Sequence, residues 1–566
     1  MRTLKSSKAA ILLLLLFVFV NAVSAASPDP ERGTRGMVVS ASDLASQVGV
    51  LILKRGGNAV DAAVAAGFAL AVTYPPAGNI GGGGFMVIHL KNGKDIALDY
   101  REKAPAKAAK NMYLDSLGNF DPSRSTEGFL SAGVPGSVAG LIYALEHYGT
   151  MKLEDVIQPA IDLAADGFPL SFRLAEAIAS EFPQFKKNPS SSKIFIHDGA
   201  PLKEGFIFKQ PELAKTLMLI KEKGKDGFYK GEIAELIERQ SRLMGGIITK
   251  EDLVNYSVVE KEPVKGSYRG YGIVSMPPSS SGGIALIEAL NILENYSFTK
   301  EDWNSSSYIH RLVEALRYVY ADRSKHLGDE AFYPVPKEWL TSKDYAKSIF
   351  SKITDKSISS KDVLPGTAPK HESMQTTHYS VVDSYGNAVS TTTTLNSSFG
   401  SKIVVDGAGF LLNNEMDDFS SKPGEPNQFG LIGSEANSIE PGKRMLSSMT
   451  PTIVLKNNKP FMVIGSPGGS TIITVVLQTI MNVIDFHMNI QQAINAPRIH
   501  HQWLPDELYY EEFGISKDTF DNLKNMGYIF GGERILGRAE GILIDPADNI
   551  IYGATDPRGY GKAAGF

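Results

Sequence analysis

The chain has 566 residues, with 57 Lys and Arg against 62 Asp and Glu. This near balance of charge argues against a general nucleic-acid-binding protein, which needs a basic surface to displace counterions. Cysteine is absent, which excludes disulfides, a thiolate nucleophile and cysteine-ligated metal centres. The hydrophobic fraction of 43% is typical of a globular protein with a large core.

The first 25 residues have the pattern of a secretory signal peptide. Three basic residues, Arg2, Lys5 and Lys8, precede an apolar run over residues 9–20, and small residues follow at 23–25. The run has 12 residues, fewer than the ~20 needed to span a bilayer. We therefore predict a signal peptide over residues 1–25, a periplasmic or secreted mature protein, and no membrane association after signal removal.

Helices dominate the elements predicted for the first half. Asn58 predicts the N-cap of a helix, with Asp61 in its first turn. The apolar residues 85–90 predict a strand, and residues 136–320 have mostly helical periodicity. Residues 356–375 are polar and contain two prolines and several serines. That composition is typical of an exposed flexible segment.

A β-hairpin is predicted around the end of this segment. Residues 375–383 and 387–394 are rich in β-branched side chains and predict two strands. The three residues between them fit a hairpin loop whose third residue, Gly386, adopts the left-handed conformation. The change from helical to strand-rich sequence marks one junction in the chain, near residue 375.

The hairpin also predicts which threonines face each other. If Asp383 opposes Asn387, then Thr376 opposes Thr394, with Cβ atoms ~4.5–5.5 Å apart and hydroxyls within hydrogen-bonding reach. Threonine is also favoured in strands for its shape alone. A purely structural role for both threonines therefore stays open at this point.

A strand, a glycine turn and a helix are predicted over residues 461–473. Residues 461–464 are apolar, five residues with three glycines follow, and Ser470 predicts the cap of a helix. The backbone amides of Gly468 and Gly469 can stabilise an oxyanion, although such turns often serve packing. The turn lacks the Lys-Ser or Lys-Thr ending of a phosphate-binding loop, so no nucleotide site is predicted.

Histidines and isolated charged residues predict no further site by themselves. His378 and residues 500–501 have no zinc-binding spacing, so we interpret them as structural and predict no metal. Taken alone, Arg101 next to Glu102 is typical of a surface ion pair. The acidic pair at 417–418 is typical of a solvated turn or a weak calcium ligand.

Several short motifs occur in a fixed order along the chain. They are found at residues 56–63, 78–85, 99–102, 134–136, 376–380, 395–396, 412–419, 446–449, 465–470, 496–498 and 556–558. In this order they resemble the bacterial γ-glutamyltranspeptidases, which are N-terminal nucleophile hydrolases. The resemblance covers nearly all of the exported chain.

The resemblance implies a fold and a maturation step. The fold would be α+β, a four-layer αββα sandwich with two stacked, mainly antiparallel sheets. A proenzyme would cut itself between Gln375 and Thr376, giving a large subunit of residues 26–375 and a small subunit of residues 376–566. Both subunits would pair as a heterodimer and form one structural domain. No cofactor is implied.

The resemblance also implies the chemistry. The freed Thr376 would attack a γ-glutamyl amide, with its own α-amine, of pKa roughly 7.7–8.0, accepting the hydroxyl proton. Thr394 would position that hydroxyl, and the amides of Gly468 and Gly469 would form the oxyanion hole. The γ-glutamyl group of glutathione or a related compound would pass to water or to an amino acid or peptide acceptor.

A γ-glutamyl group carries an α-carboxylate and an α-ammonium, so its pocket should offer both charges. For the carboxylate, the positions matching the family are Arg101, Ser447 and Ser448. For the ammonium, they are Asn396, Glu415 and Asp418. Two alternatives stay open, namely an enzyme for poly-γ-glutamate or a cephalosporin side chain, and a solute-binding protein without turnover.

The sequence departs from the family pattern at a few positions near this site. Many members have tyrosine at Thr393, proline at Met445, arginine at Thr471, and tyrosine at Phe429 in a loop that covers the substrate. The nucleophile and the charged recognition residues are retained. The departures leave acceptor preference and the ratio of hydrolysis to transfer open.

Overall fold

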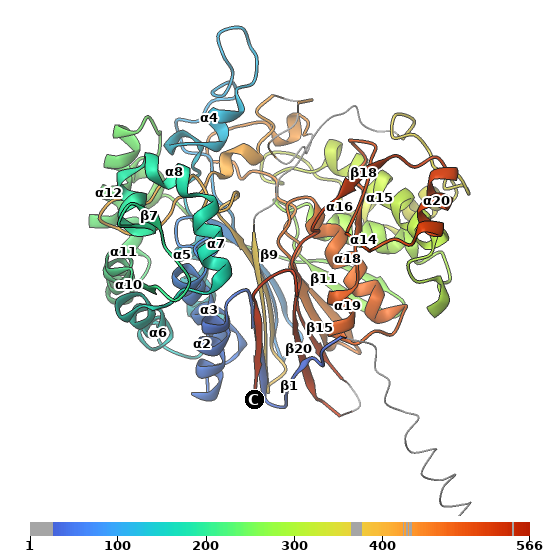
Figure 1. The fold of residues 1–566 in the computed structure, drawn as a ribbon, viewed down its shortest axis with the longest axis horizontal. Helices are drawn as coiled ribbons and strands as arrows, with labels where there is room; N and C mark the ends of the chain where they lie inside the picture. Colours follow the sequence, from blue (N-terminus) through green and yellow to red (C-terminus); the bar gives the residue numbers. More distant parts are fainter. Residues whose placement is uncertain (1–26, 364–375, 423, 426–427, 429–432, 546–547) are drawn as a thin grey trace, which may run out of the picture.

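The computed structural model describes residues 27–363, 376–422, 424–425, 428, 433–545 and 548–566 (Figure 1). The predicted signal peptide, Gln375 and Phe429 lie outside these described residues. So do residues 364–375, the later part of the predicted flexible segment. None of the described helices is long and apolar enough to cross a membrane.

Two antiparallel sheets form the centre of the molecule (Figure 1). In spatial order, the strands of the first sheet are β21 (Lys562–Gly565), β2 (Gly36–Ser40), β12 (Thr377–Asp383), β13 (Ala388–Thr394), β3 (Gly83–His89), β4 (Asp95–Tyr100) and β9 (Val259–Lys261). Those of the second sheet are β1 (Glu31–Gly33), β20 (Ile551–Thr555), β19 (Glu540–Ile544), β15 (Lys459–Gly465), β14 (Thr452–Lys456), β11 (Tyr271–Ser275) and β10 (Val264–Tyr268).

Helices cover the outer face of each sheet (Figure 1). Those on the side of the first sheet include α2 (Asp43–Lys54), α3 (Ala59–Thr73), α5 (Ser137–Tyr148), α6 (Leu153–Asp166), α7 (Phe172–Ser180), α10 (Pro211–Lys223) and α12 (Gly231–Leu243). Those on the side of the second include α14 (Gly282–Leu293), α15 (Ser306–His326), α17 (Lys343–Phe350), α18 (Thr471–Ile484), α19 (Ile490–Asn495) and α20 (Lys517–Asn525). The predicted four-layer α+β sandwich is therefore confirmed.

The first sheet is buried on both faces because its strands alternate apolar residues toward two different cores. In β3, Met86 and Ile88 belong to the core under the first helical layer. Phe85 and Val87 belong instead to the core that contains the second sheet and its helices. Side chains of a strand point alternately to opposite faces, so one strand contributes to both cores.

Each sheet combines strands from before and after residue 375. In the first sheet, β12 and β13 lie between β2 and β3, and β21 forms an edge. In the second, β10 and β11 come from the earlier part and pair with each other, and β11 also pairs with β14 of the later part. Residues 136–320, predicted as mostly helical, thus also supply three strands of the central sheets, β9, β10 and β11.

The sequence predicts two helix N-caps, one on each side of residue 375. Asn58 caps α3 as predicted, accepting hydrogen bonds from two backbone amides and forming a capping box with Asp61. Ser470 precedes α18, but its hydroxyl makes no capping bond to the helix. It donates to Gln502 Oε1 at 2.9 Å instead, so Ser470 occupies the predicted N-cap position but does not make the capping bond.

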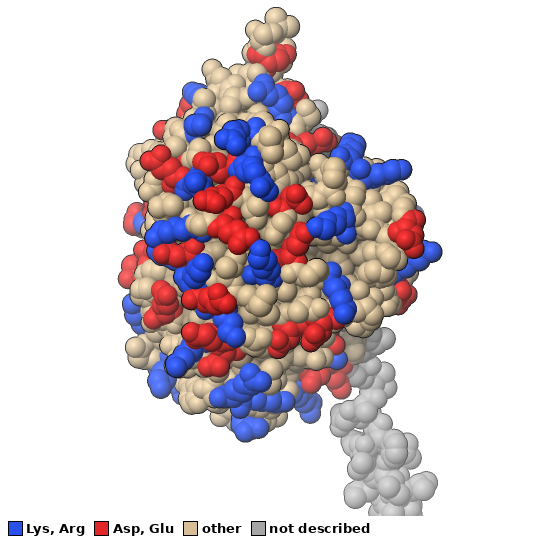
Figure 2. Space-filling view, turned by 90° about the vertical axis from the view of Figure 1, so that its left-hand side faces the viewer, with Lys and Arg blue, Asp and Glu red and all other residues tan. Residues whose placement is uncertain are grey.

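Charges on the surface are mixed. On the face shown in Figure 2, Lys and Arg side chains alternate with Asp and Glu, and no extended patch of one sign forms there. This distribution agrees with the near balance of charge in the sequence.

Candidate active site

The β12–β13 hairpin has the predicted register. Thr377 pairs with Thr393, and the ladder continues to Val382 opposite Ala388. Gly386 has a φ of 94°, in the left-handed region that the hairpin loop requires. One step beyond Thr377, the same register brings Thr376 opposite Thr394 at the open end of the hairpin. Both residues are buried.

Thr376 and Thr394 line a small cavity at this end of the hairpin. Its volume is about 20 Å³, roughly the space of one water molecule. The cavity brings together nearly all of the predicted site residues: Arg101, Thr376, Thr394, Asn396, Glu415, Asp418, Ser447, Ser448 and Gly469. Residues separated by more than 300 positions in the sequence therefore converge on one point.

Arg101 follows β4 and is the cation at the centre of this cavity. It is 1% exposed and forms ion pairs with both Glu415 and Asp418. Glu102 lies 3.6 Å from the same guanidinium. The predicted roles give Arg101 to a ligand carboxylate and the acidic residues to a ligand ammonium, whereas these side chains bind each other here. A ligand carboxylate would therefore compete with them for Arg101.

Three buried carboxyl groups thus surround one guanidinium. Burial raises the pKa of Glu415 well above its ordinary value and raises that of Asp418, while Arg101 acts in the opposite direction on both. Burial also raises the pKa of Glu102 to about 7. Desolvation disfavours the charged carboxylates, and Arg101 offsets part of this cost for all three. An ammonium group close to these carboxylates would favour their charged forms in the same way.

A serine pair and a second arginine form the opposite wall. Ser448 Oγ accepts a hydrogen bond from Arg323 of α15 at 2.9 Å, and Arg323 also donates to Ser281 Oγ at 2.9 Å. The Ser447 carbonyl accepts from the Ser281 backbone at 2.7 Å. Arg323 was not predicted from the sequence, because nothing near it in the helical pattern distinguishes it.

Asparagines hold the loops that carry the predicted residues. Asn396 adopts a φ of 75°, and its side chain donates to the Asn414 carbonyl at 3.0 Å. The Asn413 side chain accepts from Glu415 N and donates to the Gly81 carbonyl. These bonds fix the turn of Glu415–Asp418 against the glycine motif at residues 81–84.

The glycine turn lies between β15 and α18 as predicted. Gly468 and Gly469 have φ values of 138° and 56°, which other residues adopt only with strain. Gly469 lines the cavity, and the Gly468 carbonyl accepts from Thr471 N at 3.0 Å. The turn is thus held by the first residue of α18 and presents its backbone to the site.

Comparison with known proteins assigns the chain to a family. Residues 45–566 match the family model described as Gamma-glutamyltranspeptidase. The chain belongs to the γ-glutamyltranspeptidase family. It is 52% identical to a glutathione hydrolase proenzyme of Escherichia coli (strain K12), over 94% of this chain and 91% of that protein.

Two solved structures extend this result. The chain resembles a cephalosporin acylase from Bacillus halodurans, with a TM-score of 0.85 and 28% identity over 97% of this chain and 99% of that one. It also resembles the Helicobacter pylori γ-glutamyltranspeptidase, with a TM-score of 0.57 and 50% identity over 61% of this chain and 97% of that one.

The departures from the γ-glutamyltranspeptidase pattern are accommodated within the core. Thr393 donates to the Gly83 carbonyl at 2.7 Å, and Thr471 donates to the Gly468 carbonyl at 2.7 Å. Met445 is buried, and its carbonyl accepts from Arg101 Nε. Each of these three residues therefore contacts an element of the site without lining the cavity itself.

The histidines that the sequence singled out are buried in hydrogen-bond networks. His378 bonds Thr392 Oγ1 at 2.9 Å and Ser380 Oγ at 3.0 Å. Burial lowers its pKa to about 3, and burial likewise lowers that of His500 to about 3. Both imidazoles are therefore neutral at pH 7. The described residues contain no group of three or more His, Asp or Glu placed to hold a metal.

Proposed function

We propose that this chain is a self-cleaving γ-glutamyltransferase and glutathione hydrolase whose nucleophile is Thr376. The observation that carries the proposal is the convergence of Thr376 and Thr394 with Arg101, Glu415 and Asp418 in one buried cavity. A hydroxyl at the start of a strand beside a paired cation and carboxylates suits a zwitterionic acyl donor.

Maturation would create the active nucleophile. Cleavage between Gln375 and Thr376 gives a large subunit of residues 26–375 and a small subunit of residues 376–566. The two subunits stay together as a heterodimer, because each central sheet contains strands from both. Cleavage also frees the α-amine of Thr376, which lies on the same residue as the hydroxyl that it activates.

In turnover, the α-amine of Thr376 takes the hydroxyl proton as the oxygen attacks the γ-carbonyl of the substrate. The amides of Gly468 and Gly469 donate to the tetrahedral oxyanion, and Thr394 positions the attacking oxygen. The amine then passes the proton to the leaving nitrogen, and a γ-glutamyl ester remains on Thr376. Water or the amine of an acceptor resolves this ester.

Recognition of the substrate would exchange ion pairs. The α-carboxylate of the donor displaces Glu415 and Asp418 from Arg101 and also binds Ser447 and Ser448. Its α-ammonium then pairs with the released carboxylates and also binds Asn396. A cavity of about 20 Å³ has no room for a glutamyl group, so binding requires this rearrangement.

The signal pattern at residues 1–25 supports export, and we propose a periplasmic or secreted location. The donors would be glutathione and other γ-glutamyl compounds, and the acceptors amino acids or peptides. No cofactor or metal takes part in the proposed chemistry.

The test is the Thr376→Ala variant, with Thr391→Ala as a matched control in the neighbouring strand, where Thr391 is also buried. We expect wild type to separate into two fragments on a denaturing gel and to hydrolyse a γ-glutamyl anilide. Thr376→Ala should stay uncut and inactive. Activity in uncut Thr376→Ala protein would refute the mechanism.

The structural similarity to a cephalosporin acylase favours one alternative substrate, a cephalosporin side chain. The roles proposed for Glu415 and Asp418 depend instead on the α-ammonium of the substrate. Glutamyl and glutaryl amides distinguish the two, because they differ only in that group. Faster hydrolysis of glutaryl amides would contradict the roles proposed for Glu415 and Asp418. It would also support the acylase alternative.

A further inference from the structure

A second and larger cavity lies beside the proposed active site. Its volume is about 600 Å³, within the usual range for a small-molecule site. Its walls come from both sides of residue 375: residues 41–44, 73–76 and 168–181 from the earlier part, and Ser398, Arg538 and residues 558–560 from the later part.

The strand register places this cavity next to Thr376. In the first sheet, Ser40 of β2 pairs with Tyr379 of β12 in antiparallel orientation. Beyond this pair, the chain continues from β2 into Ala41 and Ser42 of the cavity wall, while β12 leads back to Thr376. The cavity wall and Thr376 therefore lie at the same end of the sheet, beyond two neighbouring strands.

Two loops connect the cavity to the active site. One passes from Asn396 in the small cavity to Ser398 in the large one. The other carries Arg538, whose backbone N–H donates to Ser466 Oγ at 3.0 Å. The residue before it packs on the glycine turn, because a Cβ atom on Gly468 would lie 3.4 Å from Cα of Gly537.

Most of the charged side chains that line the cavity are already paired. Arg558 binds Glu511 and Asp556, which lie outside the cavity wall. Arg173 pairs with Glu176 at 3.7 Å and stacks on the Tyr560 ring. Asp43 accepts from Gln47 at 2.8 Å and lies 3.5 Å from Lys562 Nζ. Glu181 is near Lys402, and its negative charge favours the protonated form of that lysine.

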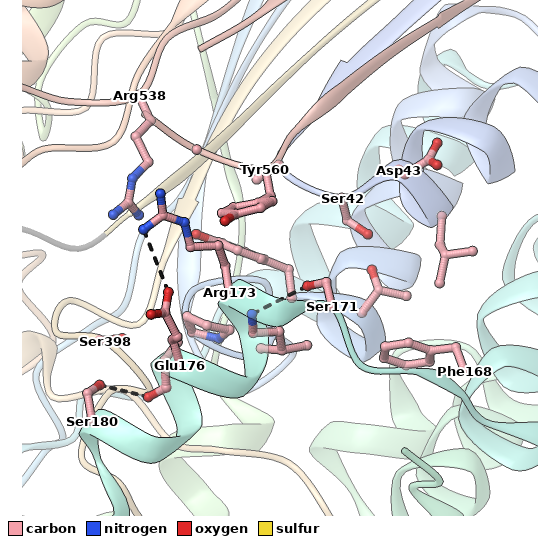
Figure 3. A pocket seen from close by; sticks show the side chains of 18 of the residues that line it. Ser42, Asp43, Phe168, Ser171, Arg173, Glu176, Ser180, Ser398, Arg538 and Tyr560 are labelled. Atoms are coloured by element: carbon pink, nitrogen blue, oxygen red, sulfur yellow. Dashed lines mark hydrogen bonds and ion pairs between the residues drawn. The ribbon is translucent and has the colours of Figure 1, made fainter. Parts of the chain in front are cut away.

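Arg538 differs from these residues. Within the described part of the chain, its guanidinium forms no ion pair with a carboxylate, and it faces the phenol of Tyr74. The Glu540 carboxyl is nearby; burial raises its pKa well above the ordinary value, and Arg538 acts in the opposite direction. Figure 3 shows Arg538 and Arg173 extending toward the same part of the cavity, beside Tyr560.

We propose that this cavity binds the acceptor, and that Arg538 holds the free carboxylate of an acceptor peptide. The proposal rests on the function proposed above. The acceptor amine, in its neutral form, attacks the carbonyl of the γ-glutamyl ester on Thr376. A carbon–nitrogen bond forms, the ester carbon–oxygen bond breaks, and a proton from the amine returns to the threonine oxygen. The rings of Phe168 and Tyr560 offer apolar contacts to the acceptor side chain.

The test compares two acceptors that differ only in charge, glycylglycine and glycylglycine amide, with a γ-glutamyl anilide as donor. In Arg538→Gln we expect the KM for glycylglycine to rise about tenfold relative to that for the amide, because a charge-assisted hydrogen bond is lost. Arg538→Lys, which keeps the charge, should give a smaller rise. The matched control is Arg534→Gln, whose guanidinium stacks 3.7 Å above Tyr509 and should not change the ratio.

An unchanged ratio of the two KM values in Arg538→Gln would overturn the proposal. If that variant does not fold, Arg538→Met, which also removes the charge, decides by the same ratio. Hydrolysis of the donor by the wild-type protein, without acceptor, is measured first. If the wild type does not hydrolyse the donor, the proposed function is contradicted and not the acceptor site. In that case calorimetric titration of glycylglycine into wild type and Arg538→Gln tests the carboxylate site directly, and equal binding by both proteins refutes it.

Discussion

Glu102 gives a quantitative test of the carboxyl cluster around Arg101. Its side chain is fully buried, and neither carboxylate oxygen has a hydrogen-bond donor among the described residues. Burial raises its pKa from 4.5 to about 7, and Arg101 opposes that shift. A group that binds its proton more tightly in the folded state stabilises the fold below pH 4.5. That stability is lost as the pH rises through about 7.

The predicted size of this effect is about 3 kcal/mol between pH 4.5 and pH 8, since one pKa unit corresponds to about 1.4 kcal/mol. Glu102→Gln keeps the shape of the side chain and removes the titration. We therefore expect the variant to be the more stable protein at pH 8, by up to this amount, with little difference at pH 5.

Urea unfolding at pH 5 and pH 8 measures this difference in stability. All proteins carry Thr376→Ala, which is expected to prevent cleavage, so that a single chain unfolds. The control is Glu435→Gln, an exposed residue paired with Lys110. It should leave the pH dependence as in the parent. If Glu102→Gln loses stability between pH 5 and pH 8 as steeply as the parent, the reasoning about this cluster is wrong.

Two further predictions concern the supports of the site. Gly465→Ala should destabilise the protein by about 1–3 kcal/mol in urea unfolding, because its Cβ would lie 2.3 Å from His378 Nδ1. Gly272→Ala, with its nearest contact at 3.5 Å, is the control, and equal losses would contradict the packing argument. Arg323→Gln should raise the donor KM about tenfold or more by freeing Ser448. Arg311→Gln on the same helix should not, and an unchanged KM in Arg323→Gln would remove Arg323 from the binding site.

The parts of the fold that the sequence predicts best are those set by local contacts. The register of the 375–394 hairpin follows from a three-residue loop and one glycine, and it holds across the whole ladder. The capping box at Asn58 depends on residues only three positions apart. The relation between Thr376 and Thr394 could therefore be predicted from adjacent strands alone.

Features that depend on distant partners could not be predicted in this way. Arg101 pairs with Glu415 and Asp418, more than 300 residues away, so local sequence suggested only a surface ion pair with Glu102. Arg323 reaches Ser448 from the middle of a regular helix. The Ser470 hydroxyl is taken up by Gln502, a tertiary contact that replaces the capping bond expected from sequence.

The central claim is that the chain start at Thr376 is made by cleavage and carries both the nucleophile and its base. N-terminal sequencing of the purified, active protein tests it most directly. The account predicts two sequences, one of which begins Thr-Thr-His-Tyr. A fully active preparation that gives a single sequence, from an intact chain spanning residues 375 and 376, would contradict it.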